Sequence, residues 1–235
     1  MVTFGRKGNS DARDPAVRKA AAELAAAALA SVQEPATRRV RVEDYLTVIA
    51  SMTGEAALIA SGVIEVEKTS SAPGSPLFGD MINRVLSGDT ADPSAVPPDS
   101  VFGLFVRELV PGTVALGDIP DLGDLYRNVA AGVGSASWGA VPLSVPPGNL
   151  PTVLPLRVAF ELRPAVDAAC EHLRLQQSQR HVPCTIALAD ALRQVQATID
   201  MRLAVRLALE VAFGMAKVTP MSRRALAASR SNDKS

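Results

Sequence analysis

Residues 185–217 carry the pattern that decides the fold of this chain, and they read TIALADALRQVQATIDMRLAVRLALEVAFGMAK. Apolar side chains recur at every third or fourth position, which is the repeat of an α-helix with one apolar face. Charged residues such as Arg193, Asp200 and Glu210 lie off that face. We therefore predict one long C-terminal helix over residues 185–217. Its apolar positions are Leu188, Leu192, Val195, Ile199, Leu203, Leu207 and Val211.

A second helix is predicted over residues 43–61, ending at Gly62. It is the most apolar element, because Glu55 is the only charged residue between Asp44 and Glu65. Small residues at helical spacing give it a narrow face on which a second backbone can approach closely. We expect it to be the buried central helix. The small residues are Ala50, Gly54, Ala57 and Ser61.

The apolar stretch at residues 45–64 also has the length of a membrane span. A carboxylate near the middle of a span is unfavourable by a few kcal/mol, roughly, and Glu55 stands near the middle of this one. No second span accompanies it. The sequence therefore favours a helix buried in protein and argues against membrane insertion.

The composition agrees with an all-α fold. Apolar residues make up 48% of the chain, yet aromatic residues make up only 4%, and alanine is abundant. Strands favour β-branched and aromatic side chains, whereas alanine favours closely packed helices. We predict a single-domain bundle of six to eight helices with a proline-rich covering loop. The other expected helices cover about residues 15–33, 76–87, 101–110, 122–133 and 151–177.

Three regions are predicted along the chain: a disordered N-terminus at residues 1–13, a helical domain at residues 14–218, and a basic flexible tail at residues 219–235. The basic stretch that starts at Lys217 has a second interpretation, a weak anchor for an anionic surface. The whole chain has no net charge, so its electrostatics give no case for nucleic acid as a partner. The first residues lack the apolar core of a secretory signal, and two cysteines make no disulfide framework, so a cytoplasmic location is expected.

Residues 132–155 read GVGSASWGAVPLSVPPGNLPTVLP and show no periodicity. This segment holds Trp138, the only tryptophan of the chain. One interpretation is a cover in which Trp138, Val141, Leu143 and Val145 close the core from outside. The alternative is a lid or a docking strip, because long aperiodic loops in compact domains are often functional.

All cysteines and histidines of the chain lie in one window of fifteen residues, at Cys170, His172, His181 and Cys184. A zinc site needs four converging ligands, but a helix turns by about 100° per residue and so points Cys170 and His172 about 200° apart. His181 and Cys184 remain weak candidate ligands, and we expect neither metal nor another cofactor. A thiol near a helix N-terminus has a lowered pKa, so Cys184 is expected to be the more reactive cysteine.

Glu55 is the other candidate for chemistry, because a lone carboxylate in an apolar helix must be paired, protonated or functional. Arg157 and Arg163 lie where they can reach it, although Arg157 and Glu161 also fit an intrahelical pair. The structural interpretation is an internal arginine–glutamate pair that joins two helices. The functional interpretation is a ligand site built from Glu55, Arg157 or Arg163, with Trp138 as a further candidate.

The chain contains none of the phosphate-loop, dinucleotide, zinc-protease or serine-hydrolase motifs. We therefore favour a non-enzymatic helical interaction or assembly protein that is oligomeric. The long helix or the Trp138 segment would be its docking surface for a protein partner or a second copy. The alternative is a helical pocket for an apolar or anionic small molecule, with Glu55 and Arg157 inside. An enzyme of unknown class that uses these two residues comes third.

Overall fold

The computed structural model describes residues 12–88, 90, 92, 95–110, 112–132 and 141–224. Within these residues the chain forms eight α-helices and no strand, which confirms the all-α prediction. One isolated antiparallel bridge joins Pro76 to Val218. The helices are α1 (Pro15–Val32), α2 (Val42–Ala60), α3 (Asp80–Ser87), α4 (Val101–Leu109), α5 (Leu122–Ala131), α6 (Pro155–His172), α7 (His181–Val195) and α8 (Met201–Met215).

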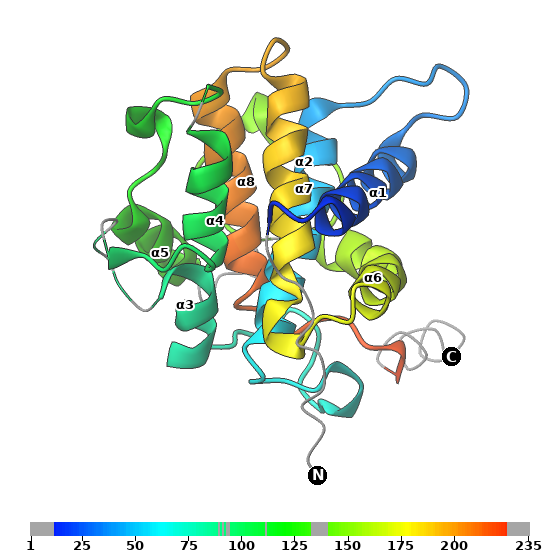
Figure 1. The fold of residues 1–235 in the computed structure, drawn as a ribbon, viewed down its shortest axis with the longest axis vertical. Helices are drawn as coiled ribbons and strands as arrows, with labels where there is room; N and C mark the ends of the chain where they lie inside the picture. Colours follow the sequence, from blue (N-terminus) through cyan, green and yellow to red (C-terminus); the bar gives the residue numbers. More distant parts are fainter. Residues whose placement is uncertain are drawn as a thin grey trace.

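Helix α2 lies at the centre and packs against α1, α6, α7 and α8. Figure 1 shows α7 and α8 side by side in front of it, with α1 and α6 on the right and α3, α4 and α5 on the left. Sixteen residues of α2 are buried, because the helix is apolar on every face. Among the described residues, no helix combines the length and the apolar character that crossing a membrane requires.

The small-residue face of α2 is the place where α8 approaches most closely. A Cβ atom added to Gly54 would lie 2.2 Å from the carbonyl oxygen of Ala212 and 2.7 Å from the Cβ of Met215. Real side chains never tolerate such distances, so only glycine fits here. The close helix contact predicted from this face is therefore confirmed.

The long helix predicted over residues 185–217 is wrong, because the chain turns at residues 196–200 and forms α7 and α8 instead. Asp200 caps the new helix, and its carboxylate accepts a hydrogen bond from the amide of Leu203 at 3.0 Å. Aspartate favours this N-cap position over the interior of a helix. Most side chains of α7 and α8 are buried inside the chain, so these helices form a large part of the core.

The described part of the proline-rich segment, residues 141–154, runs as coil with one short 3₁₀ turn (η5, Pro147–Asn149). Two buried carboxylates hold it: Glu210 accepts from the amide of Ser144 at 2.7 Å, and Asp44 accepts from the amide of Thr152 at 2.6 Å. Val141 and Val145 are buried against the core. These residues thus cover the helices, whereas Trp138 falls in a stretch that the structure does not describe.

Several boundaries differ from those expected. Helix α1 begins where expected, because the carboxylate of Asp14 accepts a hydrogen bond from the amide of Ala16 at 2.7 Å and caps the helix. Helix α3 begins later than predicted, because the residues before it are hydrogen-bonded to the stretch that follows α8. The amide of Thr219 donates to the carbonyl oxygen of Ser75 at 2.7 Å, and the amide of Leu77 donates to the carbonyl oxygen of Lys217 at 2.7 Å.

The two ends of the described chain are packed further than the sequence suggested. Ala12 is buried, although residues 1–13 were expected to be disordered, and residues 1–11 lie outside the described part. Lys217, Thr219 and Ser222 are also buried, so the packed domain continues beyond residue 218. The remainder of the expected basic tail, residues 225–235, is not described.

Candidate functional site

The cysteine and histidine window does not form one site. Cys170 and His172 lie at the end of α6, and His181 and Cys184 lie in the first turn of α7. Among the described residues, no group of three or more histidine, cysteine, aspartate or glutamate side chains is placed to hold a metal ion.

The two thiols are poor nucleophiles. Cys184 is completely buried, and this burial raises the pKa of its thiol far above the ordinary value. The expectation that the helix N-terminus activates Cys184 is therefore wrong, because the loss of water outweighs the helix dipole. Burial also raises the pKa of Cys170, whose Sγ lies 3.9 Å from the carbonyl oxygen of Arg180.

His181 is a buried neutral side chain. Burial lowers the pKa of its imidazole, and its Nε2 lies 2.8 Å from the carbonyl oxygen of Asp99. Since a carbonyl oxygen only accepts, Nε2 carries the proton and donates it. His181 thereby ties the start of α7 to the loop before α4.

Glu55 of α2 is paired with Arg163 of α6, deep between the two helices. Nε of Arg163 donates to one carboxylate oxygen at 2.7 Å, and an Nη atom donates to the other at 2.9 Å. The same Nη atom also donates to the carbonyl oxygen of Met221 at 2.6 Å, so the pair anchors the chain that follows α8. Arg157 instead points to the surface and pairs with Glu161 at 2.8 Å.

The main hollow on the described surface is a groove between the end of α2 and helix α6. It consists of two adjoining cavities of about 390 and 600 Å³. We call it the α2–α6 groove. Its walls come from α2, the coil and 3₁₀ turn after it (η1, Val66–Lys68), α6, the turn before α7 and the C-terminal stretch. Both cavities share the lining residues Ile59, Glu65, Val66, Asp167 and Arg180.

Charges of both signs line the α2–α6 groove in equal number, over apolar side chains. The acids are Glu65, Glu67, Glu161, Asp167 and Glu171, and the bases are Lys68, Arg163, Arg174, Arg180 and Arg223. The apolar lining includes Ile59, Ile64, Val66, Phe160 and Leu175.

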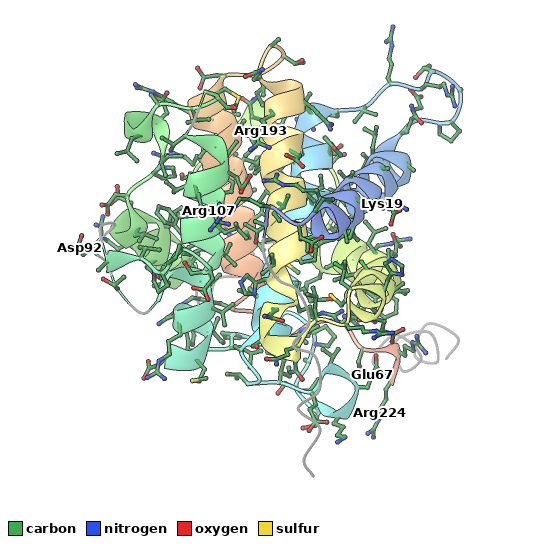
Figure 2. All side chains as sticks on the ribbon, in the orientation of Figure 1. Lys19, Glu67, Asp92, Arg107, Arg193 and Arg224 are labelled. Atoms are coloured by element: carbon green, nitrogen blue, oxygen red, sulfur yellow. The ribbon has the colours of Figure 1, made fainter. Side chains whose placement is uncertain are left out.

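Many of these charges are paired with one another. Arg180 forms an ion pair with Asp167, Lys68 lies 2.5 Å from Glu65, and Arg163 lies 3.7 Å from Glu67. The amide of Arg223 donates to Glu67 at 3.2 Å. Figure 2 labels Glu67 and Arg224 at the lower end of the molecule, close to the end of the described chain.

Of the predicted ligand-binding residues, the groove contains Arg163, with Glu55 buried behind it as its partner. Arg157 is not among the lining residues of either cavity, and Trp138 is not described. Of the other charged residues of the groove, the sequence pattern singled out Glu161 alone, as the partner of Arg157. The run Glu65-Val66-Glu67-Lys68 was the one visible signal, since it places several charges on a short connection.

Comparison of the chain with models of protein families, with curated proteins and with solved structures finds no match. The function is therefore inferred from the geometry of the groove and from the chemistry of the residues that line it.

Proposed function

We propose that this chain is a non-enzymatic binding protein that holds a short polypeptide segment in the α2–α6 groove. The observation that supports this best is the lining, in which ten charged residues of balanced sign surround an apolar floor. Such a surface suits a peptide with an apolar side chain and charges of both signs, because Glu171 and Arg174 have no ion pair among the described residues and remain to pair with the peptide. The combined cavity is also within the size range of ligand sites.

An anionic small molecule fits the groove less well. Arg163 already spends its donors on Glu55 and on the carbonyl oxygen of Met221, and Glu67 lies close to it. The lining has as many acids as bases, so it offers a compact anion no net positive charge. The pocket built from Glu55 and Arg157 also lacks support, because Arg157 forms its own pair at the surface.

The reactive groups of the described residues favour binding over catalysis. No histidine lines the groove, and the one cysteine that does, Cys170, has a pKa raised by burial. The groove thus offers no thiolate and no imidazole as nucleophile or base.

A peptide-display library of random sequences tests the proposal. Purified full-length chain is used as the target, and peptides enriched on it are measured against two variants. The first, Glu65→Arg with Glu171→Arg, reverses two exposed charges of the groove. The second, Glu23→Arg, reverses an exposed charge on α1, where Figure 2 shows Lys19 of the same helix pointing outward.

We expect the enriched peptides to bind the groove variant about tenfold more weakly or worse, a change of about 1.4 kcal/mol. Binding to Glu23→Arg should be unchanged. If no peptide is enriched, or if enriched peptides bind both variants equally, the groove is not a peptide site.

Self-association remains a separate prediction. Val63, Phe78 and Met81 are large apolar side chains that remain exposed near the end of α2 and the start of α3. They would be suitable contacts for a second copy, and the state of association is tested below.

A further inference from the structure

Lys217 is a buried lysine at the end of α8. Only 6% of the residue is exposed, although lysine is almost never buried without a partner. Its Nζ donates to the side-chain oxygen of Asn83 at 2.8 Å. It also lies 4.7 Å from the ring centre of Tyr126 and 5.9 Å from that of Phe78.

The groups that contact this amine in the described part of the chain are neutral. Asn83 on α3, Tyr126 on α5 and Phe78 on the coil before α3 supply an amide and two aromatic rings, and no ion pair of Lys217 occurs among the described residues. The other two lysines of the described chain differ in this respect. Lys19 and Lys68 have mostly exposed side chains, and each has a glutamate within 4 Å, Glu23 and Glu65.

We propose that Lys217 is a nucleophilic amine, a site at which a small uncharged aldehyde or ketone condenses to an imine. An amine in apolar surroundings without a carboxylate is the arrangement that activates lysine for this chemistry. The desolvation that comes with burial lowers the pKa of Lys217, so a larger share of it is neutral near pH 7. This inference is independent of the peptide groove.

The reaction balances without an oxidant or reductant. The lone pair of neutral Nζ attacks the carbonyl carbon, and a proton moves from nitrogen to oxygen to give a carbinolamine. Loss of water then forms the C=N bond. The ring of Tyr126 lies 4.7 Å from Nζ, and its hydroxyl lies 2.8 Å from that of Ser87, so these two hydroxyls are candidates for moving the protons.

Access to the amine is through Phe78. The centre of its ring lies 5.9 Å from Nζ, and 54% of Phe78 is exposed, so this side chain connects the surroundings of the amine to the surface. The backbone next to it is open as well, since the closest atom to a Cβ built on Gly79 is Cγ2 of Val63 at 3.9 Å. A small carbonyl compound would reach Nζ by displacing this ring, which the variant Phe78→Ala tests.

The test is reductive alkylation of the full chain with propanal and sodium cyanoborohydride, with peptide mass mapping of each lysine. At pH 7 we expect Lys217 to be propylated faster than Lys68 by about an order of magnitude, because the neutral fraction of the amine sets the rate. The pKa of Lys68 is raised, first by its hydrogen bond to Glu65, which makes it a suitable internal reference. The rate at Lys217 should also reach its plateau at a lower pH than the rate at Lys68.

Asn83→Asp is the matched variant, because it keeps the shape of the side chain and gives Lys217 a carboxylate. It should slow the reaction at Lys217 several-fold and leave that at Lys68 unchanged, whereas Phe78→Ala should accelerate the reaction at Lys217. If Lys217 of the wild-type chain reacts more slowly than Lys68, the proposal is overturned. The proposal is also overturned if Lys217 reacts fast and Asn83→Asp does not slow this reaction. If Asn83→Asp does not fold, the pH at which the wild-type rate at Lys217 reaches its plateau decides between the two outcomes: a plateau no lower than that of Lys68 overturns the proposal.

Discussion

The Glu55–Arg163 pair shows how the loss of a single side chain can strongly lower the stability of this fold. Both side chains are almost completely buried, and each satisfies the charge of the other. Removing one partner leaves an isolated charge in a region of low dielectric constant.

We therefore predict that Arg163→Ala lowers the free energy of unfolding by about 3–5 kcal/mol. Arg157→Ala, on the exposed face of the same helix, should leave the urea midpoint unchanged. Chemical denaturation of both variants measures the difference. Equal midpoints for the two variants would mean that the buried pair contributes nothing.

His181 gives the chain a pH dependence of known sign. Burial lowers the pKa of the folded imidazole, so below the unfolded pKa of about 6.5 the unfolded chain binds a proton that the folded chain does not. The contribution of His181 to the free energy of unfolding is fully present above that pH, and it decreases as the pH falls toward the folded pKa. His181→Gln should flatten the dependence of the urea midpoint on pH below about 6.5. A slope equal to that of the wild type would assign the effect to other groups.

The sequence pattern predicted that Glu55 has a partner but did not identify which arginine it is. A lone carboxylate in an apolar helix required a partner, and two arginines of α6 qualified. Arg157 and Arg163 are six positions apart, so they point about 240° apart on a helix, and only one of them can face α2. The rotation of α6 decides which, and tertiary packing sets that rotation.

At the scale of elements, the contact between α2 and α8 depends on Gly54. Its α-carbon is nearly in contact with the backbone of Ala212. Gly54→Leu should therefore overpack the core and reduce the free energy of unfolding by about 1–3 kcal/mol or more. Thermal denaturation measures this loss. Gly62→Leu is not a suitable control, because the positive φ of Gly62 would itself strain a leucine. Gly117→Leu, with open space around its α-carbon, is the better one.

The turn between α7 and α8 shows where periodicity fails. Ile199 lies in the turn but packs against the core, so it continues the apolar stripe of both helices and conceals the break. The cap at Asp200 was the relevant signal. We predict that Asp200→Ala lowers the free energy of unfolding by about 1 kcal/mol, whereas Asp121→Asn, at the cap of α5, should change it little since asparagine caps equally well. An unchanged urea midpoint for Asp200→Ala would show that the turn is held by packing alone.

At the scale of the whole molecule, fold class followed from composition and spacing, whereas the groove did not. Its charges come from α2, η1, α6 and the stretch after α8, which the fold brings together from residues 59 to 223. The sequence of any one of these segments does not predict the groove. Conversely, the conspicuous cluster of cysteines and histidines proved to be separate residues, of which Cys170, His181 and Cys184 are buried and His172 is exposed, because nearness in sequence does not make side chains converge.

The last prediction concerns assembly and the proline-rich segment. Buried carboxylates of α2 and α8 fix residues 144 and 152, so the described part of this segment is held firmly on the core. Trp138 lies just before this part in the sequence, and a large indole is the typical anchor of an interface. If Trp138 contacts a second copy, Trp138→Ala should convert an oligomer to monomer in light scattering and leave the helical circular dichroism unchanged.

If the indole covers its own chain, the same variant should instead lose about 3–5 kcal/mol of stability without a change of mass. Both outcomes require a blue-shifted tryptophan fluorescence that quenchers do not reach. Leu116→Ala, which removes another exposed large apolar side chain, controls for a general loss of exposed apolar surface. A red-shifted and freely quenched signal in the wild-type chain would refute both roles, because an indole in water neither anchors a partner nor closes a core.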